Sequence, residues 1–153
     1  EHSVFDKIIL CDSISSAIAD TEAVLTAVPT PEPVLFFKDL PANVFISTMG
    51  GDSRTTQLDR EILERAEIIP DNEEQCKKSG EFKNALEGGY YNKINFVRIS
   101  NRVANIGDAA LGKLNLRDKG IKMAYFTGLA VQDINAAKMV YEKYQFLNNK
   151  EIA

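Results

Sequence analysis

The sequence is poor in the residues that build metal centres and nucleic-acid surfaces. Its 153 residues include one histidine and two cysteines, too few for a zinc site made from His and Cys ligands. The net charge is −4 without a basic cluster, which argues against binding to nucleic acid. No apolar run approaches the ~20 residues that a membrane-spanning helix needs. With 44% apolar and 26% charged residues, the composition is that of a soluble globular domain.

The two cysteines indicate the compartment. Cys11 falls in a strand-like segment and Cys76 in a helix-like one, and their spacing is not that of a disulfide framework. Isolated thiols of this kind are typical of a reducing environment, so we expect a cytoplasmic protein. Residues 1–4 lack the basic flank and the apolar core of a signal peptide. They also lack Met, so residue 1 need not be the biological start.

The most informative stretch is a short apolar run that ends at two glycines. Residues 44–48 are rich in β-branched side chains, and Gly50, Gly51 and Asp52 follow shortly after them. We predict a buried strand whose carboxyl end opens onto a tight loop, where glycines let a ligand approach the backbone. Asp52 would then lie at the mouth of a ligand site. The alternative is a plain turn that carries a solvated acid.

Other apolar runs alternate with helix-like segments. We predict strands over residues 4–11, 23–28, 67–71, 94–99 and 122–127. We predict helices over residues 14–19, 60–66, 72–86 and 105–114, the second of them capped by Asp59. This alternation indicates βαβ units and therefore an α/β fold, with a mostly parallel sheet and flanking helices.

The last predicted helix is the clearest element of the chain. It carries an apolar stripe about four turns long at helical spacing. The stripe consists of Ala130, Ile134, Ala137, Tyr141 and Tyr144. Because such a stripe is too apolar to remain in water, we expect it to pack against protein. We divide the chain just before this helix, into residues 1–128 and residues 129–153.

Small or hydroxyl residues follow the ends of three predicted strands. They are Thr26 and Ala27, then Thr48 to Gly51, then Thr127 and Gly128. The carboxyl ends of parallel strands lie side by side at one edge of a sheet. We therefore expect one edge lined by hydroxyl groups and bare backbone, as a polar cofactor requires.

Four ordered blocks resemble the ornithine cyclodeaminase/μ-crystallin family. Residues 21–35 (TEAVLTAVPTPEPVL) resemble its "ADIVVTAT-P-x-x-EPVL" strand and loop, and residues 46–59 resemble its "I-x-x-x-GGD … ELD" signature. Residues 106–113 (IGDAALGK) are similar to "LGDVLAGK", and residues 128–141 (GLAVQDINAAKMVY) are similar to "GLAxQDxAAAxxVY". Four blocks at similar spacing, across about residues 13–145, are far more specific than any one motif.

The resemblance implies a Rossmann-like, NAD(P)-dependent enzyme that acts on a small amino acid or a cyclic imine. The family's activities include the conversion of L-ornithine to L-proline and ammonia, alanine dehydrogenation and ketimine reduction. Asp52 matches the family's catalytic carboxylate, which would act as general base towards the substrate amine or an attacking water. Arg54 is the nearest cation, and we expect it to pair with Asp52 and lower the pKa of that carboxyl group.

The resemblance also implies which residues contact NAD or NADP. They are Thr26 and Ala27, then Met49, Gly50 and Gly51, and finally Thr127. Judged from the residues alone, Thr26 and Thr127 could equally satisfy their own backbone at the ends of strands.

The chain departs from the family at its beginning. Before Ser13 there is no GxGxxA-type loop, which holds the cofactor's pyrophosphate in the family. The family's N-terminal half, which supplies the Arg and Lys that grip the substrate, also has no counterpart. The chain thus resembles the C-terminal half of a longer protein, with an incomplete dinucleotide-binding domain over residues 1–128 and a helix and tail over residues 129–153.

Two functions from different classes remain open. The first is an enzyme of this family that works as a homodimer or together with the missing N-terminal half. The second is a non-catalytic remnant of the family that acts as a binding or structural module.

Overall fold

The computed structural model describes residues 6–50 and 52–150. Within them, a four-stranded sheet has the order β1-β2-β6-β3, and every pair of neighbours is parallel. Its strands are β1 (Ala23–Thr26), β2 (Val44–Met49), β3 (Glu67–Pro70) and β6 (Ile121–Phe126). The α/β class and the parallel sheet predicted from the sequence are confirmed.

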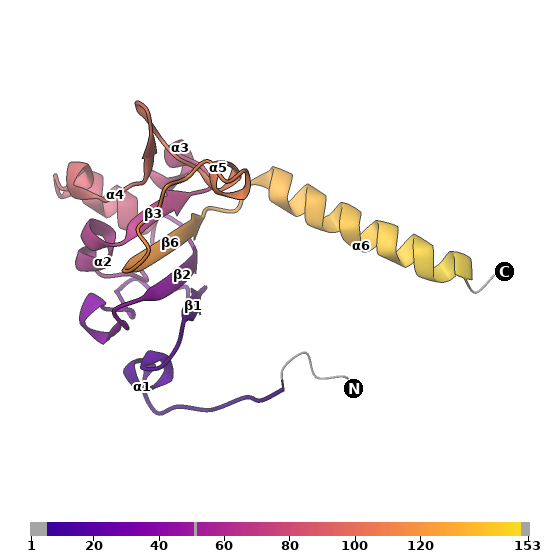
Figure 1. Cartoon of the computed structure of the whole chain (residues 1–153), viewed down its shortest axis with the longest axis horizontal. Helices are drawn as coiled ribbons and strands as arrows, with labels where there is room; N and C mark the ends of the chain where they lie inside the picture. The colour runs from indigo at the N-terminus through magenta and orange to yellow at the C-terminus, as the bar shows by residue number, and fades with distance from the viewer. Residues whose placement is uncertain (1–5, 51, 151–153) are drawn as a thin grey trace.

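Besides the sheet, the described residues form six helices and a small hairpin (Figure 1). The helices are α1 (Ile14–Ile18), α2 (Arg60–Arg65), α3 (Glu73–Cys76), α4 (Gly80–Glu87), α5 (Ile106–Ala110) and α6 (Ala130–Lys150). The antiparallel hairpin consists of β4 (Arg98–Ile99) and β5 (Arg102–Val103), and single 3-10 turns cover Phe37–Asp39 and Tyr91–Lys93.

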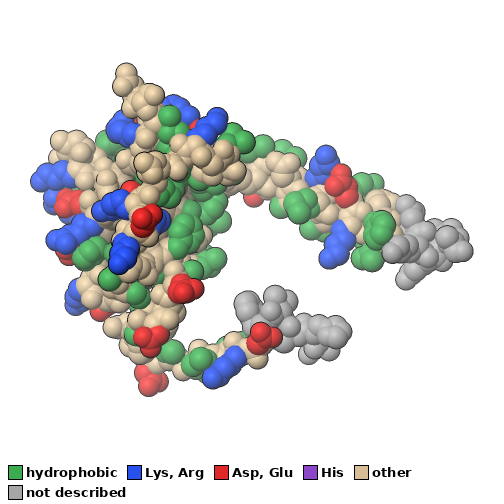
Figure 2. Space-filling model, in the orientation of Figure 1, with side chains coloured by type: hydrophobic (Ala, Val, Ile, Leu, Met, Phe, Trp, Pro, Cys, Tyr) green, Lys and Arg blue, Asp and Glu red, His purple; other side chains and the backbone are tan. Residues whose placement is uncertain are grey.

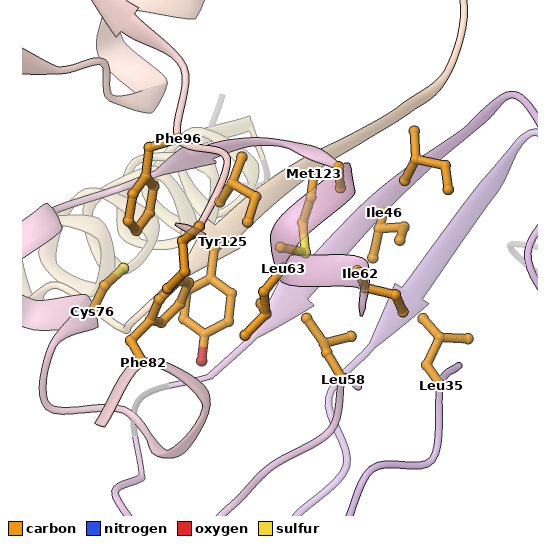
Figure 3. Packing of buried hydrophobic residues seen from close by; sticks show 14 of the residues in the cluster. Leu35, Ile46, Leu58, Ile62, Leu63, Cys76, Phe82, Phe96, Met123 and Tyr125 are labelled. Atoms are coloured by element: carbon orange, nitrogen blue, oxygen red, sulfur yellow. The ribbon is translucent and has the colours of Figure 1, made fainter. Parts of the chain in front are cut away.

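One apolar core lies between the sheet and helices α2 and α4. Ile46 of β2 and Met123 of β6 are fully buried, and Ile62 and Leu63 of α2 belong to the same cluster (Figure 3). The predicted N-cap of α2 is confirmed, because an Asp59 carboxylate oxygen accepts a hydrogen bond from the Ile62 N–H at 3.0 Å. This cap fixes the direction in which α2 enters the core.

Aromatic rings close the core beside the carboxyl end of β6. The Phe82 ring of α4 meets the Tyr125 ring of β6 edge-to-face at 4.7 Å, and it stacks on Phe96 at 5.4 Å (Figure 3). Cys76 lies buried beside these rings. Helix α4 is thereby held against the carboxyl end of β6.

The predicted helix over residues 72–86 is two helices, α3 and α4, with the break over residues 77–79. A Cβ atom on Gly80 would lie 1.8 Å from the Thr55 carbonyl oxygen, so the backbone of α4 begins in direct contact with another loop. The predicted strand over residues 94–99 is mostly loop: Phe96 forms one isolated bridge with Ile68, and only Arg98–Ile99 is strand.

The strand predicted over residues 4–11 is wrong for the part that the structure describes, residues 6–11. These residues form no strand, and the Leu10 side chain is 93% exposed. A strand needs a neighbour for its hydrogen bonds and a face to bury. Within the described residues nothing extends the sheet beyond β1, and residues 6–11 run away from it (Figure 1).

The last helix forms as predicted, but its packing against protein is wrong for this chain. Helix α6 projects away from the sheet, with hydrophobic side chains along its surface (Figures 1 and 2). Ile134 is 67% exposed and Tyr141 is 62% exposed. Of the described helices, none has both the length and the apolar character to cross a bilayer. The domain boundary after residue 128 stays a prediction.

Candidate functional site

The ends of β1, β2 and β6 meet at one edge of the sheet, as the sequence predicts. Thr26 is level with Thr48 in the β1–β2 pair, and Met49 is level with Phe126 in the β2–β6 pair. Beyond the last pair, the Gly50 N–H donates to the Phe126 carbonyl at 2.7 Å. The carboxyl edge of the sheet is therefore continuous across these three strands.

A pocket of about 300 Å³ opens at this edge. Its lining residues are Ala27, Val28, Pro29, Met49, Gly50, Asp52, Thr55 and Gln57. Four residues that the sequence assigned to a site, Ala27, Met49, Gly50 and Asp52, thus line one pocket. Gly51 lies outside the described residues. Neither Thr26 nor Thr127 lines the pocket, and whether any of these residues binds a cofactor stays a prediction.

A larger pocket of about 570 Å³ lies at the opposite edge, where β6 begins. Arg65 and Arg117 line it, and both are engaged with carboxylates: Arg65 with Glu61 at 2.9 Å and Arg117 with Glu67 at 3.4 Å. Ligands of open α/β sheets bind at the carboxyl ends of the strands. Size alone therefore does not make this pocket the better candidate.

Asp52 lies at the rim of the smaller pocket and pairs with Arg54, as predicted. One carboxylate oxygen accepts from the Arg54 backbone N–H at 2.8 Å and from its Nε at 3.2 Å, and the other accepts from Nη2 at 3.0 Å. The Asp52 side chain is 43% exposed. The side-chain and backbone hydrogen bonds from Arg54 hold the pKa of Asp52 below its usual range, which weakens it as a base.

The hydroxyl groups of Thr26 and Thr127 are engaged inside the protein. Thr26 Oγ1 donates to Gln57 Oε1 at 2.8 Å. Thr127 Oγ1 donates to one carboxylate oxygen of Asp71 at 2.9 Å, and the Thr127 N–H donates to the other at 2.8 Å. Both threonines are thus held by side chains of other elements rather than by their own backbone.

Gly50 has no room for a side chain, but the reason is internal packing. A Cβ atom there would lie 2.0 Å from the hydroxyl oxygen of Tyr125. That hydroxyl donates to Glu81 Oε2 at 2.6 Å, and burial together with the Glu81 charge raises the pKa of Tyr125. The glycine therefore lets the β2 loop cross a buried tyrosine, whereas the sequence suggested space for a ligand.

Val28, Pro29, Thr55 and Gln57 line the pocket without having been assigned to it from the sequence, and Gln57 makes the most contacts there. It is 1% exposed, and its side chain bonds to the strand ends on both sides of the pocket. A signal was available, because Gln57 directly precedes the core residue Leu58 in a segment that leads into a buried helix. A polar side chain at such a position must find partners inside the protein.

Comparison with known proteins gives one consistent family. The sequence model described as the ornithine cyclodeaminase/mu-crystallin family matches residues 4–147. The chain is 32% identical to the alanine dehydrogenase of Archaeoglobus fulgidus over 124 residues, which cover 79% of this chain and 37% of the relative.

Solved structures that share the fold include two enzymes. An archaeal alanine dehydrogenase dimer with bound NAD superposes with a TM-score of 0.67 at 29% identity, over 83% of this chain and 39% of that one. The second is the Thermococcus litoralis Δ1-pyrroline-2-carboxylate reductase in complex with NADH and L-proline. It superposes with a TM-score of 0.72 at 20% identity, over 90% of this chain and 42% of that one. The chain therefore spans only 37% of the curated relative and 39% and 42% of the two structures.

Proposed function

The chain belongs to the ornithine cyclodeaminase/mu-crystallin family, and from this premise we propose that it forms the nicotinamide side of an NAD(P)-dependent enzyme. The enzyme would interconvert a small amino acid and its imine or oxo acid. One observation carries this proposal: Ala27, Met49, Gly50 and Asp52 line a single pocket at the carboxyl edge of the parallel sheet. An acid thus lies beside the strand ends at which open α/β sheets bind ligands.

The pocket suits one end of the cofactor better than the other. Its volume of about 300 Å³ is at the lower end of small-molecule sites, and Ala27, Val28 and Pro29 give it a small apolar wall. These features fit a flat ring. A pyrophosphate binds to backbone N–H groups at a helix start. At the start of α2 the Ile62 N–H already donates to Asp59, so this N–H is not available to a pyrophosphate.

We therefore propose that a further polypeptide segment supplies the pyrophosphate site. It would continue the sheet beyond β1, whose outer edge pairs with nothing in the described part of the chain. It would belong to the same protein or to a second subunit; the similar archaeal alanine dehydrogenase is a dimer.

Asp52 is the residue we assign to proton transfer. In the oxidative direction NAD(P)+, when bound, accepts hydride from the substrate carbon. The Asp52 carboxylate would accept a proton from the substrate ammonium or from an attacking water, and it lies at the pocket rim where such groups arrive. To act as a base it must separate from Arg54, whose side chain is solvent-exposed.

A chimera tests the proposed function. This chain would replace the matching segment of the Archaeoglobus alanine dehydrogenase. NADH oxidation would be followed with pyruvate plus ammonia and with Δ1-pyrroline-2-carboxylate. Ammonia release would be followed with L-ornithine and NAD, because that conversion consumes no net NADH. We expect turnover with one of these substrates and a loss of about 10²- to 10⁴-fold in Asp52→Asn. A folded chimera that does not bind NADH would contradict the cofactor assignment.

The ion pair between Asp52 and Arg54 favours a second candidate, a non-catalytic module. Three hydrogen bonds from Arg54 occupy the carboxylate, and an acid used only to hold its loop needs no more. The same chimera separates the two candidates. If it binds NADH but turns over none of the substrates, and Asp52→Asn changes nothing, the module is favoured.

A further inference from the structure

One buried amide joins the two walls of the pocket. Gln57 Oε1 accepts from Thr26 Oγ1 and from the Val28 N–H, both at 2.8 Å. Gln57 Nε2 donates to the Met49 carbonyl at 2.7 Å. Val28 belongs to the loop after β1 and Met49 to the end of β2, and both residues line the pocket. A single side chain therefore bridges the two loops.

The bridge lies where the sheet no longer holds these strands together. The β1–β2 ladder ends at the pair Thr26 and Thr48. Beyond that pair, the loop containing Val28 and the loop after Met49 diverge around the pocket. The Gln57 amide replaces the missing ladder bonds, and so its two arms set the distance between the pocket walls.

The chemistry of the partners requires a neutral amide. The Val28 N–H can only donate, so the atom that faces it must accept. The Met49 carbonyl can only accept, so the atom that faces it must donate. A carboxylate lacks the donor and an apolar side chain lacks both groups. Of the residues close to Gln57 in size, only Gln provides this pattern without a proton being added.

The backbone of Gln57 is fixed as firmly as its side chain. Its carbonyl accepts from the N–H groups of Val34 and Leu35, both at 3.0 Å, and its N–H donates to Glu81 Oε1 at 2.7 Å. Glu81 in turn accepts from the Tyr125 hydroxyl, against which Gly50 packs. The backbone that carries the amide is thus fixed by hydrogen bonds. A residue can position others only if it is itself held in place.

We propose that Gln57 is a positioning residue whose side-chain amide sets the width of the pocket between the loops after β1 and β2. The part of this inference that concerns a nicotinamide ring rests on the proposed function. The part that concerns the pocket does not, and it can be tested on the 153-residue chain without any ligand.

Amide hydrogen exchange of the chain tests the proposal with Gln57→Leu and a control, Asn105→Ala. Asn105 caps α5 and does not line the pocket. In Gln57→Leu we expect the Val28 N–H to exchange at least tenfold faster, because its acceptor is gone. The Ile68 N–H, which bonds to the Asn95 carbonyl in the core, should keep its protection. The control should leave Val28 unchanged. Unchanged exchange at Val28 in Gln57→Leu, or an equal loss at Val28 and Ile68, would overturn the proposal.

Gln57→Glu gives a second test that a merely space-filling role would not pass. The new carboxyl group would face the Met49 carbonyl. Glu81 accepts from the backbone N–H of the same residue, and Asp52, paired with Arg54, lines the same pocket. Burial and the negative neighbours would raise the pKa of the new carboxyl group in the folded state, so its stabilising protonated form is lost as the pH rises. We expect the Tm of this variant to approach that of wild type at pH 5 and to fall below it by pH 8. An equal Tm difference from wild type at both pH values would argue against the donor role.

The NADH arm of the experiment uses the alanine dehydrogenase chimera. If the proposed function holds, Gln57→Leu should raise the KM for NADH at least tenfold with a smaller change in kcat, and Gln57→Glu should recover part of the loss at pH 5. An unchanged KM in a chimera that turns over would overturn the part of the proposal that concerns the nicotinamide ring. A chimera that never binds NADH would count against the proposed function alone, because the exchange experiment decides the role of Gln57 independently.

Discussion

Helices α2 and α6 both carry apolar side chains, but of the two only α2 buries them. Helix α2 has six residues, and its Ile62 and Leu63 lie in the core under the sheet (Figure 3). Helix α6 has 21 residues, and Ile134 and Tyr141 face solvent. The longer helix is therefore the one whose apolar side chains have no surface to pack against in the described part of the chain. An apolar stripe creates a need for burial, and the position of the helix decides whether this chain meets it.

The difference arises where each helix starts. Before α2, Leu35 forms a bridge with Leu58 and Asp59 caps the first turn, so the helix turns back over the sheet. Before α6, Thr127 is held by Asp71 at the end of β3, and the chain then passes through Gly128 at a φ of 76°. This exit directs α6 away from the described part of the sheet (Figure 1).

The comparison is tested most strongly by removing one buried and one exposed isoleucine. Ile62→Ala should lower the free energy of unfolding by about 2–5 kcal/mol, because it leaves a cavity in the core. Ile134→Ala should change it by less than about 0.5 kcal/mol in the monomeric chain. Urea denaturation followed by circular dichroism measures both. Similar losses in the two variants would mean that α6 is packed in solution.

Self-association could supply α6 with the partner that α2 finds within the chain. Apolar side chains are exposed along α6 and on residues 6–11, and exposed apolar surface of this kind favours association. We expect sedimentation velocity to show dimers or larger species whose population rises with protein concentration. Removal of residues 129–153 should shift the chain towards monomer. A clean monomer at high concentration before the removal would contradict this expectation.

Capping gives a smaller contrast between the two helices. Asp59→Ala removes the acceptor for the N–H groups of Ile62 and Phe37, and should lower the free energy of unfolding by about 1 kcal/mol. At the start of α6, Gln132→Ala removes two hydrogen bonds. The Gln132 side chain accepts one from the Leu129 N–H and donates the other to the Asp71 carboxylate. The substitution should cost less, about 0.5 kcal/mol, because one of these bonds is long and no core helix depends on it. The reverse order in urea denaturation would show that the start of α6 matters more than its exposure suggests.

The sequence predicted what depends on neighbours along the chain. The N-cap at Asp59, the pairing of Asp52 with Arg54 and the shared edge of β1, β2 and β6 follow from local chemistry and from the rules for parallel strands. The residues of the site that lie on this edge could therefore be named before the fold was known.

The parts that could not be predicted depend on long-range partners. Whether residues 6–11 form a strand and whether α6 is buried depend on another element that packs against them. The spacing of apolar residues does not reveal such an element. The bridging role of Gln57 depends on contacts with residues 26, 28 and 49, and the need for Gly50 depends on Tyr125. Each of these partners is specified by the fold rather than by the residues beside it.

The smallest expected effects on stability come from two ion pairs, one near α5 and one on α6. Asp108 accepts hydrogen bonds from both terminal nitrogens of Arg102, at 2.7 and 2.8 Å, and from the Asn105 N–H at 3.0 Å. The Arg102 guanidinium, with the Asn105 backbone N–H, lowers the pKa of Asp108 to about 2. On α6, Lys138 and Glu142 lie 3.7 Å apart and both are exposed.

The pH dependence of the first pair follows from the sign of its shift. Because the folded pKa of Asp108 is below the usual value near 3.8, the pair stabilises the fold fully above that value and loses its effect as the pH falls towards 2. Asp108→Asn should therefore lower the Tm at pH 7, and its deficit relative to wild type should shrink between pH 4 and pH 2. Glu142→Gln should change stability by only about 0.3–0.5 kcal/mol at pH 7, as exposed helical pairs do. A deficit in Asp108→Asn that persists unchanged to pH 2 would mean that the Asn side chain disrupts packing around α5, and the charge of Asp108 would then not be the stabilising feature.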